Sequence, residues 1–212
     1  MEIVNSFQWS SHQPLIRAAM ELYVPKFVLE LGIGIHSTPI FLEYNTKYLG
    51  IESNKNWIDH IRGIYEGINV LHHDVGELTL DIHLKDLTEV QKSEIYFYYA
   101  NIKIPDLKPN LLFMDQYISC RTIAINTISE KFDIVIYHDC EPAGIIAYDY
   151  NLINVKGFNT YYLKSSDSWT AIMINQEGDK CFNELQRTII PFIEIYKTKF
   201  PNCTYMELTD KY

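Results

Sequence analysis

Apolar residues along the chain gather in short runs, each bounded by polar or turn-forming sequence. The first run, KFVLELG, is apolar at nearly every position, which is typical of a strand buried on both faces of a parallel sheet. A Ser-Asp-Ser turn separates the last two runs, so they predict a β-hairpin. The predicted strands cover residues 26–32, 47–53, 68–74, 110–116, 132–139, 158–165 and 169–176.

Helical spacing of apolar residues marks segments between the predicted strands. It also predicts a first helix over 11–24, where Ser10 or Ser11 would cap the free N–H groups and Pro14 fits the first turn. The same spacing predicts a C-terminal helix after residue 176. The other predicted helices cover residues 37–44, 54–66, 84–95, 118–130 and 142–154.

Strands that alternate with helices predict a parallel sheet, because each crossover helix returns the chain to the same end of the sheet. The predicted fold class is therefore α/β: a three-layer Rossmann-like sandwich with helices on both faces and an antiparallel strand near one edge. A length of 212 residues suits a single domain. We divide it into an N-terminal helix (11–24), a core (26–176) and a C-terminal helical extension (177–212).

Composition narrows the class of protein. Hydrophobic residues make up 47% of the chain and charged residues 21%, which is typical of a folded globular protein. The net charge of −9 argues against an extended nucleic-acid surface, which needs clustered Lys and Arg. The chain has no run of about 18 apolar residues for a membrane span, and its first residues lack signal-peptide features. Cys120, Cys140, Cys181 and Cys203 form no C-x-x-C pair and have no zinc-like spacing. Because Cys120 lies in a predicted helix and Cys140 at a strand end, we expect reduced thiols in a cytoplasmic protein.

The sequence FVLELGIGIHST places Gly32 and Gly34 at the end of the first predicted strand. Glycine there lets backbone N–H groups approach a ligand without a Cβ in the way, and ligands of such sheets bind at the carboxyl ends of the strands. Glu52 ends the second predicted strand, where a carboxylate can accept both hydroxyl groups of a ribose. Asp74 ends the third predicted strand, where its carboxylate can accept a hydrogen bond from an adenine amino group. Together with Glu30, these carboxylates predict an adenosine-containing cofactor.

At these positions the sequence resembles the class I S-adenosylmethionine-dependent methyltransferases. E-L-G-I-G-I-H-S-T is similar to their motif I, and Glu52 and Asp74 are similar to their acidic residues after strands two and three. LLFMD and DIVIYHD resemble strands four and five of the small-molecule branch, so the resemblance covers about residues 11–176. His36 replaces the third glycine of the motif, and Lys131-Phe132 replace a Gly-Gly pair before strand five.

The resemblance implies a seven-stranded sheet whose last strand is antiparallel, with S-adenosyl-L-methionine as methyl donor. It also implies that Glu30 and the glycine turn lie near the methionine moiety of that cofactor. The predicted cofactor-binding residues are Glu30, Gly32, Gly34, Ser37, Glu52, Ser53, Asp74 and Asp115.

Candidates for the transfer chemistry follow the fourth and fifth predicted strands. A hydroxyl or amine acceptor must lose a proton, so His138 or Asp139 is the predicted catalytic base. The alternative for His138 is a histidine that is simply hydrogen-bonded at a strand end. Mg²⁺ held by Asp115 and Asp139 is a further alternative, which we do not favour, and we assign no metal ligand. Tyr117 and Glu141 are additional candidates.

Two other segments have alternative interpretations. Gln8, Trp9, Ser11 and His12 precede the first predicted strand, where they would either contact a ligand or cap the first helix. The run Tyr96-Phe97-Tyr98-Tyr99 is predicted to lie in an aromatic-rich insertion before strand four. It would line an acceptor pocket, or it would cover a sheet edge or a homodimer interface.

Methyl transfer to an oxygen or nitrogen of a small molecule (a metabolite, sugar or natural product) is the function that these features favour. An NAD-linked oxidoreductase is one alternative, although its third glycine would fall at position 37, where serine stands. A non-catalytic nucleoside-binding protein is another. Nucleic-acid methylation is less favoured, because MDQY follows strand four in place of an N/D-P-P-Y/F tetrapeptide.

Overall fold

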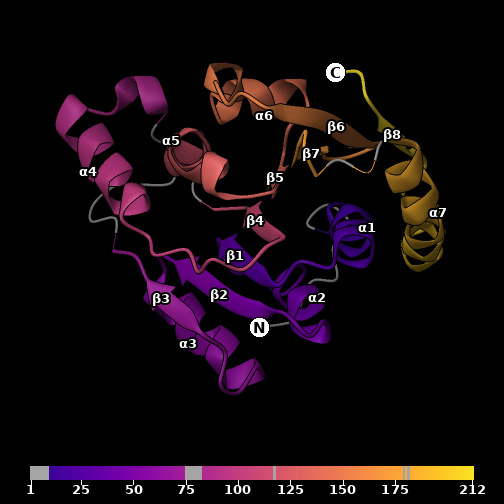
Figure 1. Cartoon of the computed structure of the whole chain (residues 1–212), viewed down its shortest axis with the longest axis horizontal. Coiled ribbons are helices and arrows are strands. Elements are labelled where there is room, and N and C mark those ends of the chain that lie inside the picture. Colours follow the sequence, from indigo (N-terminus) through magenta and orange to yellow (C-terminus); the bar gives the residue numbers. More distant parts are fainter. Residues whose placement is uncertain (1–9, 75–82, 117, 179, 181) are drawn as a thin grey trace.

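The computed structural model of the chain describes residues 10–74, 83–116, 118–178, 180 and 182–212. Its centre is an eight-stranded sheet in the order β3-β2-β1-β4-β5-β7-β6-β8 (Figure 1). The first five strands run parallel to one another, as the alternation of strands and helices predicts. They are β1 (Phe27–Leu31), β2 (Lys47–Glu52), β3 (Val70–His72), β4 (Asn110–Met114) and β5 (Ile134–His138).

The remaining strands make antiparallel pairs. β6 (Phe158–Ser165) and β7 (Thr170–Asn175) form the predicted hairpin, and β7 pairs with β5. β8 (Met206–Thr209) then pairs with the outer side of β6. The sheet therefore has one strand more than the seven predicted. The extra strand lies in the segment predicted as a helical extension, where MELT alternates buried and exposed side chains and covers the edge of β6.

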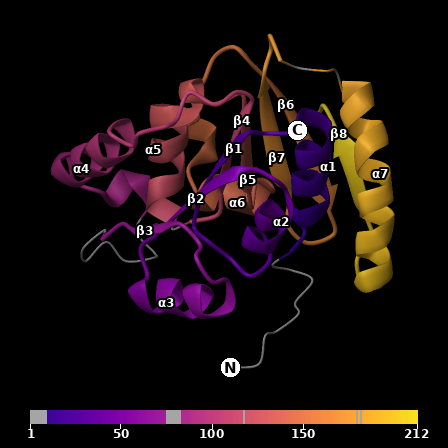
Figure 2. The same cartoon turned by 60° about the horizontal axis from the view of Figure 1, so that its bottom comes forward.

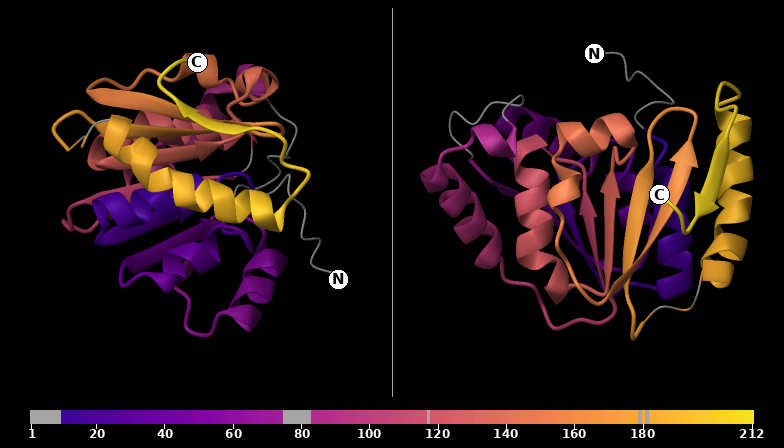
Figure 3. Two further views of the ribbon diagram at one scale, coloured as in Figure 1. Left: turned by 90° about the vertical axis from the view of Figure 1, so that its right-hand side faces the viewer. Right: turned by 90° about the horizontal axis from the view of Figure 1, so that it is seen from above.

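Helices cover both faces of the sheet, which confirms the predicted three-layer arrangement (Figure 3). They are α1 (Gln13–Tyr23), α2 (Thr38–Glu43), α3 (Lys55–Ile64), α4 (Glu89–Ala100), α5 (Ile118–Ile128), α6 (Pro142–Ala147) and α7 (Phe182–Lys199), with 3₁₀ turns at Leu84–Asp86, Ser129–Lys131 and Tyr150–Leu152. One face carries α1, α2 and α7, and the other carries α4 and α5. In the part of the chain that is described, no helix is both long and apolar enough to cross a membrane.

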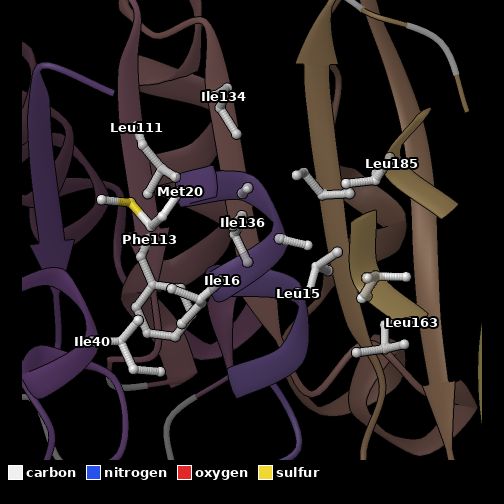
Figure 4. Packing of buried hydrophobic residues seen from close by; sticks show 14 of the residues in the cluster. Leu15, Ile16, Met20, Ile40, Leu111, Phe113, Ile134, Ile136, Leu163 and Leu185 are labelled. Atoms are coloured by element: carbon white, nitrogen blue, oxygen red, sulfur yellow. The ribbon is translucent and has the colours of Figure 1, made fainter. Parts of the chain in front are cut away.

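Successive residues of the central strands enter opposite cores. Leu111 and Phe113 of β4 belong to the core beneath α1, whereas Leu112 and Met114 belong to the core beneath α5. Figure 4 shows Met20 of α1 beside Leu111 and Phe113. Because both faces of these strands are buried, their sequences are apolar at nearly every position.

α7 lies along α1 on the same side of the sheet (Figure 2). The hydroxyl of Ser10, just before α1, lies 3.1 Å from the phenolic oxygen of Tyr196 on α7. The ring of His12 lies over Phe113 of β4 and His138 of β5, with centroid distances of 5.2 and 4.7 Å. The start of α1 is thereby held over the carboxyl ends of β4 and β5.

Three local predictions differ from the structure. Residues 96–99 are not an insertion but the last turns of α4, which begins later than predicted, after a capping box at Thr88. His12 occupies the N-cap position of α1, and no side chain caps that helix. The helix predicted over 142–154 is divided into α6 and a 3₁₀ turn, with Asp149 in the left-handed region between them.

The turn between β1 and α2 requires glycine at position 32 for two reasons. Gly32 has a φ of +83°, which L side chains rarely adopt. A Cβ there would also lie 2.4 Å from the carbonyl oxygen of Asp115, so the turn packs directly against the backbone after β4. Gly34 has no positive φ, and the nearest contact of an added Cβ would be Ser37 Oγ at 3.3 Å.

We expect Gly32→Ala to lower the free energy of unfolding by about 2–4 kcal/mol, from backbone strain together with the clash against Asp115. Gly63→Ala is the matched control, because a Cβ at Gly63 in α3 meets nothing within 4 Å and alanine favours a helix. Urea denaturation followed by circular dichroism measures both changes. Equal stability of the two variants would contradict the requirement for glycine at position 32.

Candidate active site

Glu30 lies inside the junction between β1 and α2 and is completely buried. Its carboxylate accepts hydrogen bonds from the hydroxyls of Ser37, Thr38 and Tyr48, with Thr38 Oγ1 at 2.7 Å. Burial raises the pKa of Glu30 to about 7, although the three hydrogen bonds oppose this shift. Glu30 and Ser37 therefore hold the glycine turn together from inside, and their contact with a cofactor stays a prediction.

Glu52, at the end of β2, lies beside the glycine turn. Its Oε1 accepts the backbone N–H groups of Ser53 at 2.7 Å and Asn54 at 2.8 Å. Burial raises the pKa of Glu52, while these bonds and the N–H group of Ile33 oppose the shift. Trp57 of α3 donates to the carbonyl oxygen of Ile33 at 2.7 Å and ties α3 to the same turn. This half-buried carboxylate therefore lies where a ribose-binding residue is predicted. Its role in binding stays a prediction.

Asp74 lies just beyond β3 and is exposed. His72 of β3 stands opposite Glu52 in the register of β2 and β3, which places Asp74 at the same edge of the sheet as Glu52. Beside it, the ring of His73 stacks on Tyr98 of α4 with centroids 3.3 Å apart. Tyr98, from the predicted aromatic run, therefore covers the end of β3, on the side predicted for adenine.

Arg121 of α5 is a buried cation between the ends of β4 and β5. Its Nη2 donates to Asp115 Oδ1 at 2.8 Å, and its Nη1 donates to Asp139 Oδ2 at 3.0 Å. Nη1 also donates to the backbone oxygen of His138 at 3.0 Å. The ring of Tyr148 covers the guanidinium at 4.0 Å. One side chain thereby fixes the two predicted aspartates relative to each other.

Asp139 directly follows β5 and has a φ of +59°, a conformation that is uncommon outside glycine and often found at functional sites. Its carboxylate also accepts hydrogen bonds from Ser168 Oγ at 2.8 Å and from the Tyr148 hydroxyl at 3.0 Å. Burial would raise the pKa of Asp139, but the charges of His138 and Arg121 lower it overall. Asp139 is therefore held as a carboxylate.

His138, the last residue of β5, is buried beside both aspartates. Its Nε2 lies 2.9 Å from Ser11 Oγ, and its Nδ1 lies 3.3 Å from Asp139 Oδ1 and 3.7 Å from Asp115 Oδ1. Burial would lower the pKa of His138, but Asp139 and Asp115 raise it above its ordinary value overall. The ring is hydrogen-bonded at the end of a strand, as the non-catalytic alternative for His138 predicts. It also faces two carboxylates, which a role in proton transfer requires.

The residues before α1 lie over this cluster. Ser11 contacts His138 instead of capping α1, and the ring of His12 stands nearly perpendicular to the His138 ring. Burial, with a smaller effect of His138, lowers the pKa of His12 to about 3, so its ring is neutral near pH 7. Predictions that concern Gln8, Trp9, Tyr117 and Cys181 fall outside the described residues.

The structure therefore brings Asp115, His138 and Asp139 into one cluster at the ends of β4 and β5. Asp115, predicted as a cofactor-binding residue, lies between this cluster and the glycine turn. Sequence reasoning missed Arg121, because a single arginine within a mostly apolar helix has no spacing signal. Glu141 lies at the edge of the cluster, where it accepts a backbone N–H just before β7 at 3.1 Å.

Comparison with known proteins identifies the fold. No protein-family model matches the sequence, and the search of curated proteins gives no match. The N-methyltransferase NodS from Bradyrhizobium japonicum WM9 is a similar solved structure, with a TM-score of 0.51 and 11% identity over 81% of this chain and 98% of NodS. An O-methyltransferase from Bacillus cereus in complex with SAH has the same TM-score and identity over 76% of this chain and 79% of its own.

The chain thus has the Rossmann-like fold of S-adenosylmethionine-dependent methyltransferases. At this level of identity the similarity shows the fold alone. One of the two similar proteins is named for a nitrogen acceptor and the other for an oxygen acceptor.

Glu30→Gln removes a carboxyl group whose pKa is about 7 in the folded chain, against an ordinary value of 4.5. Between these values the folded state binds more protons than the unfolded state, so the contribution of Glu30 to stability falls as the pH rises. As the pH rises from about 5 to about 8, we expect the free energy of unfolding of the variant to increase by about 2–3 kcal/mol relative to that of the wild type. Thermal denaturation at both pH values measures this, and a constant difference would contradict the raised pKa.

Arg121→Met leaves two half-buried carboxylates without their buried cation, so we expect the free energy of unfolding to fall by about 2–4 kcal/mol. Arg187→Met, at an exposed position of α7, is the matched control and should change it by less than about 0.5 kcal/mol. Arg121→Lys keeps the charge but loses the planar fork of donors. Its loss in free energy of unfolding should lie between those of the two methionine variants. Chemical denaturation measures all three; similar values for the two methionine variants would argue against Arg121 as the organising residue.

Proposed function

We propose that the protein is an S-adenosylmethionine-dependent methyltransferase that acts on an oxygen or nitrogen atom of a small molecule. The observation that supports this most strongly is the contact between the glycine turn and the acid–base cluster. Gly32 packs against the backbone of Asp115, whose carboxylate lies 3.7 Å from His138. The predicted cofactor turn and a proton acceptor thereby share one end of the sheet, where ligands of this fold bind.

The residues around the glycine turn fit S-adenosylmethionine. Glu52 is half-buried beside the turn, with Oε1 oriented by backbone N–H groups, and it would bind the ribose hydroxyls next to Ser53. Asp74 would accept the adenine amino group, and the turn of Gly32 would lie against the methionine moiety. Glu30 would act indirectly, because its carboxylate is enclosed by three hydroxyls and shapes the turn. The cofactor would supply a methyl group that its sulfonium already activates, so alignment is the main task of the protein.

His138, supported by Asp139, would remove the proton from the acceptor. The acceptor oxygen or nitrogen bonds to the methyl carbon as the carbon–sulfur bond breaks, and its proton passes to His138. Asp139 is the weaker candidate for the base, because Arg121, Tyr148 and Ser168 already donate to its carboxylate. The negative charge of Asp139 instead stabilises the protonated ring of His138.

The low exposure of this cluster favours a small acceptor. The side chains of Asp115 and Asp139 are 27% and 23% exposed, whereas that of His138 is 4% exposed. Ser11 and His12 are buried over the cluster and restrict the approach from the side of α1. The net charge of −9 also disfavours a nucleic-acid acceptor, which is a polyanion.

Isothermal titration calorimetry with S-adenosylhomocysteine tests the cofactor assignment. We expect saturable binding by the wild type, and about tenfold weaker binding by Glu52→Gln, because a charge-assisted hydrogen bond to ribose is lost. Glu66→Gln, at an exposed position after α3, is the matched control and should bind like the wild type.

The competing functions predict different results in measurements of ligand binding and methyl transfer. No binding of S-adenosylhomocysteine at high micromolar concentration by folded protein would overturn the proposal, and fluorescence quenching by NADH would then favour an NAD-linked oxidoreductase. Methyl transfer is measured as release of S-adenosylhomocysteine with hydroxyl and amine acceptors. His138→Ala should lose this release and still bind the cofactor. Binding without any release across such acceptors would favour a non-catalytic nucleoside-binding protein.

A further inference from the structure

His12 places an unsatisfied polar ring next to the acid–base cluster. The residue is 1% exposed, and among the described residues neither its Nδ1 nor its Nε2 has a hydrogen-bond partner. Most buried polar groups are hydrogen-bonded, because removing them from water without a partner costs free energy. The mechanism proposed above makes no use of this ring. A buried imidazole with two available nitrogens therefore points to a ligand.

Three side chains from separate parts of the chain converge at this point. His12 is the N-cap of α1, Asp115 follows β4 and His138 ends β5. One ligand atom from each lies within 4.8 Å of the others. Ligand atoms of a tetrahedral Zn²⁺ site are about 3.4 Å apart. A contraction of roughly 1.5 Å in the widest separation would therefore place all three around one ion.

Hydrogen bonds orient two of the three side chains, His138 and Asp115. Ser11 Oγ engages His138 Nε2 at 2.9 Å, so Nδ1 is the nitrogen that faces Asp115. Arg121 donates to Asp115 Oδ1 at 2.8 Å, and the same oxygen lies 3.7 Å from His138 Nδ1, so the carboxylate is held beside the ring. Asp139 lies 3.3 Å from His138 Nδ1, and an ion would replace the proton at that nitrogen. Outer partners of this kind fix the orientation of metal ligands.

We propose that His12, Asp115 and His138 form a binding site for a divalent transition-metal ion at the carboxyl ends of β4 and β5. Two imidazoles and one carboxylate suit Zn²⁺, Fe²⁺, Mn²⁺ or Co²⁺ better than Mg²⁺ or Ca²⁺, which take oxygen ligands. This ligand set differs from the magnesium site of Asp115 and Asp139 that the sequence suggested as an alternative. Three protein ligands leave coordination positions for a further oxygen, and the partly exposed Asp115 lies on the accessible side.

The catalytic role of this ion rests on the proposed methyltransferase function, whereas ion binding itself does not. With neutral histidine rings, Asp115, Asp139 and Arg121 carry one net negative charge, and a divalent ion converts it to one net positive charge. That charge favours an acceptor that binds as an oxygen anion, so it selects an alcohol or phenol over an amine. The ion lowers the pKa of the bound hydroxyl, whose proton then leaves to solvent. His138 would then act as a ligand rather than as the base.

Titration of the chelator-treated full chain with Co²⁺ tests the site, because visible absorption of the ion reports its coordination. We expect one Co²⁺ per chain, displaced by Zn²⁺. His12→Phe keeps an aromatic ring against Phe113 but removes the ligand, and should weaken Co²⁺ binding at least about tenfold. His60→Phe, an exposed histidine of α3, is the matched control and should bind like the wild type.

The outcomes separate this proposal from the methyltransferase assignment. Unchanged Co²⁺ affinity in His12→Phe, or equal loss in His60→Phe, would overturn the metal site. His12→Gln, checked by circular dichroism, provides a second variant if the phenylalanine variant does not fold. A wild type that binds S-adenosylhomocysteine but no Co²⁺ retains the proposed function and lacks the metal site. One that binds Co²⁺ but no S-adenosylhomocysteine retains the metal site and lacks the proposed function.

Discussion

The buried guanidinium of Arg121 holds the carboxyl ends of β4 and β5 in a single arrangement. It donates to the carboxylates of Asp115 and Asp139 and to the backbone oxygens of Gln116 and His138, at 2.6 to 3.0 Å. A planar fork of donors can serve these acceptors together, which the point charge of a lysine cannot. Because a buried cation needs charged partners, both carboxylates stay ionised and fixed. His138 lies beside these two fixed carboxylates, and their charges raise the pKa of its ring.

The acidic residues at this end of the sheet have different roles because they occupy different positions along their strands. Glu30 lies within β1 and has the same parity as Val28, so its side chain enters the core beneath α1 and α2, where three hydroxyls enclose it. Glu52 ends β2, so its carboxylate stays half-buried beside the glycine turn. The first acid supports the turn from inside, and the second is available to a ligand at its surface.

Parts of the chain that are distant in sequence complete the site. The packing of α7 along α1 holds Ser11 and His12 over strands that lie about a hundred residues or more further along the chain. Without that packing the polar residues at the ends of β4 and β5 would face solvent, and the electrostatic shifts that buried neighbours produce would be smaller. Ser11 and His12 are therefore part of the candidate site as well as part of the buried interior.

The sequence by itself determined the order of strands and helices, the glycine at position 32 and the acids that end the strands. These features depend on local periodicity and on the conformation of single residues, which neighbouring residues largely set. Only the tertiary structure decided that Glu30 is enclosed, that Arg121 joins two aspartates, that His12 lies beside His138, and that residues 206–209 add a strand. Burial and pairing of this kind depend on contacts between distant segments, such as Ser11 with His138 across 127 residues, and no local pattern encodes them.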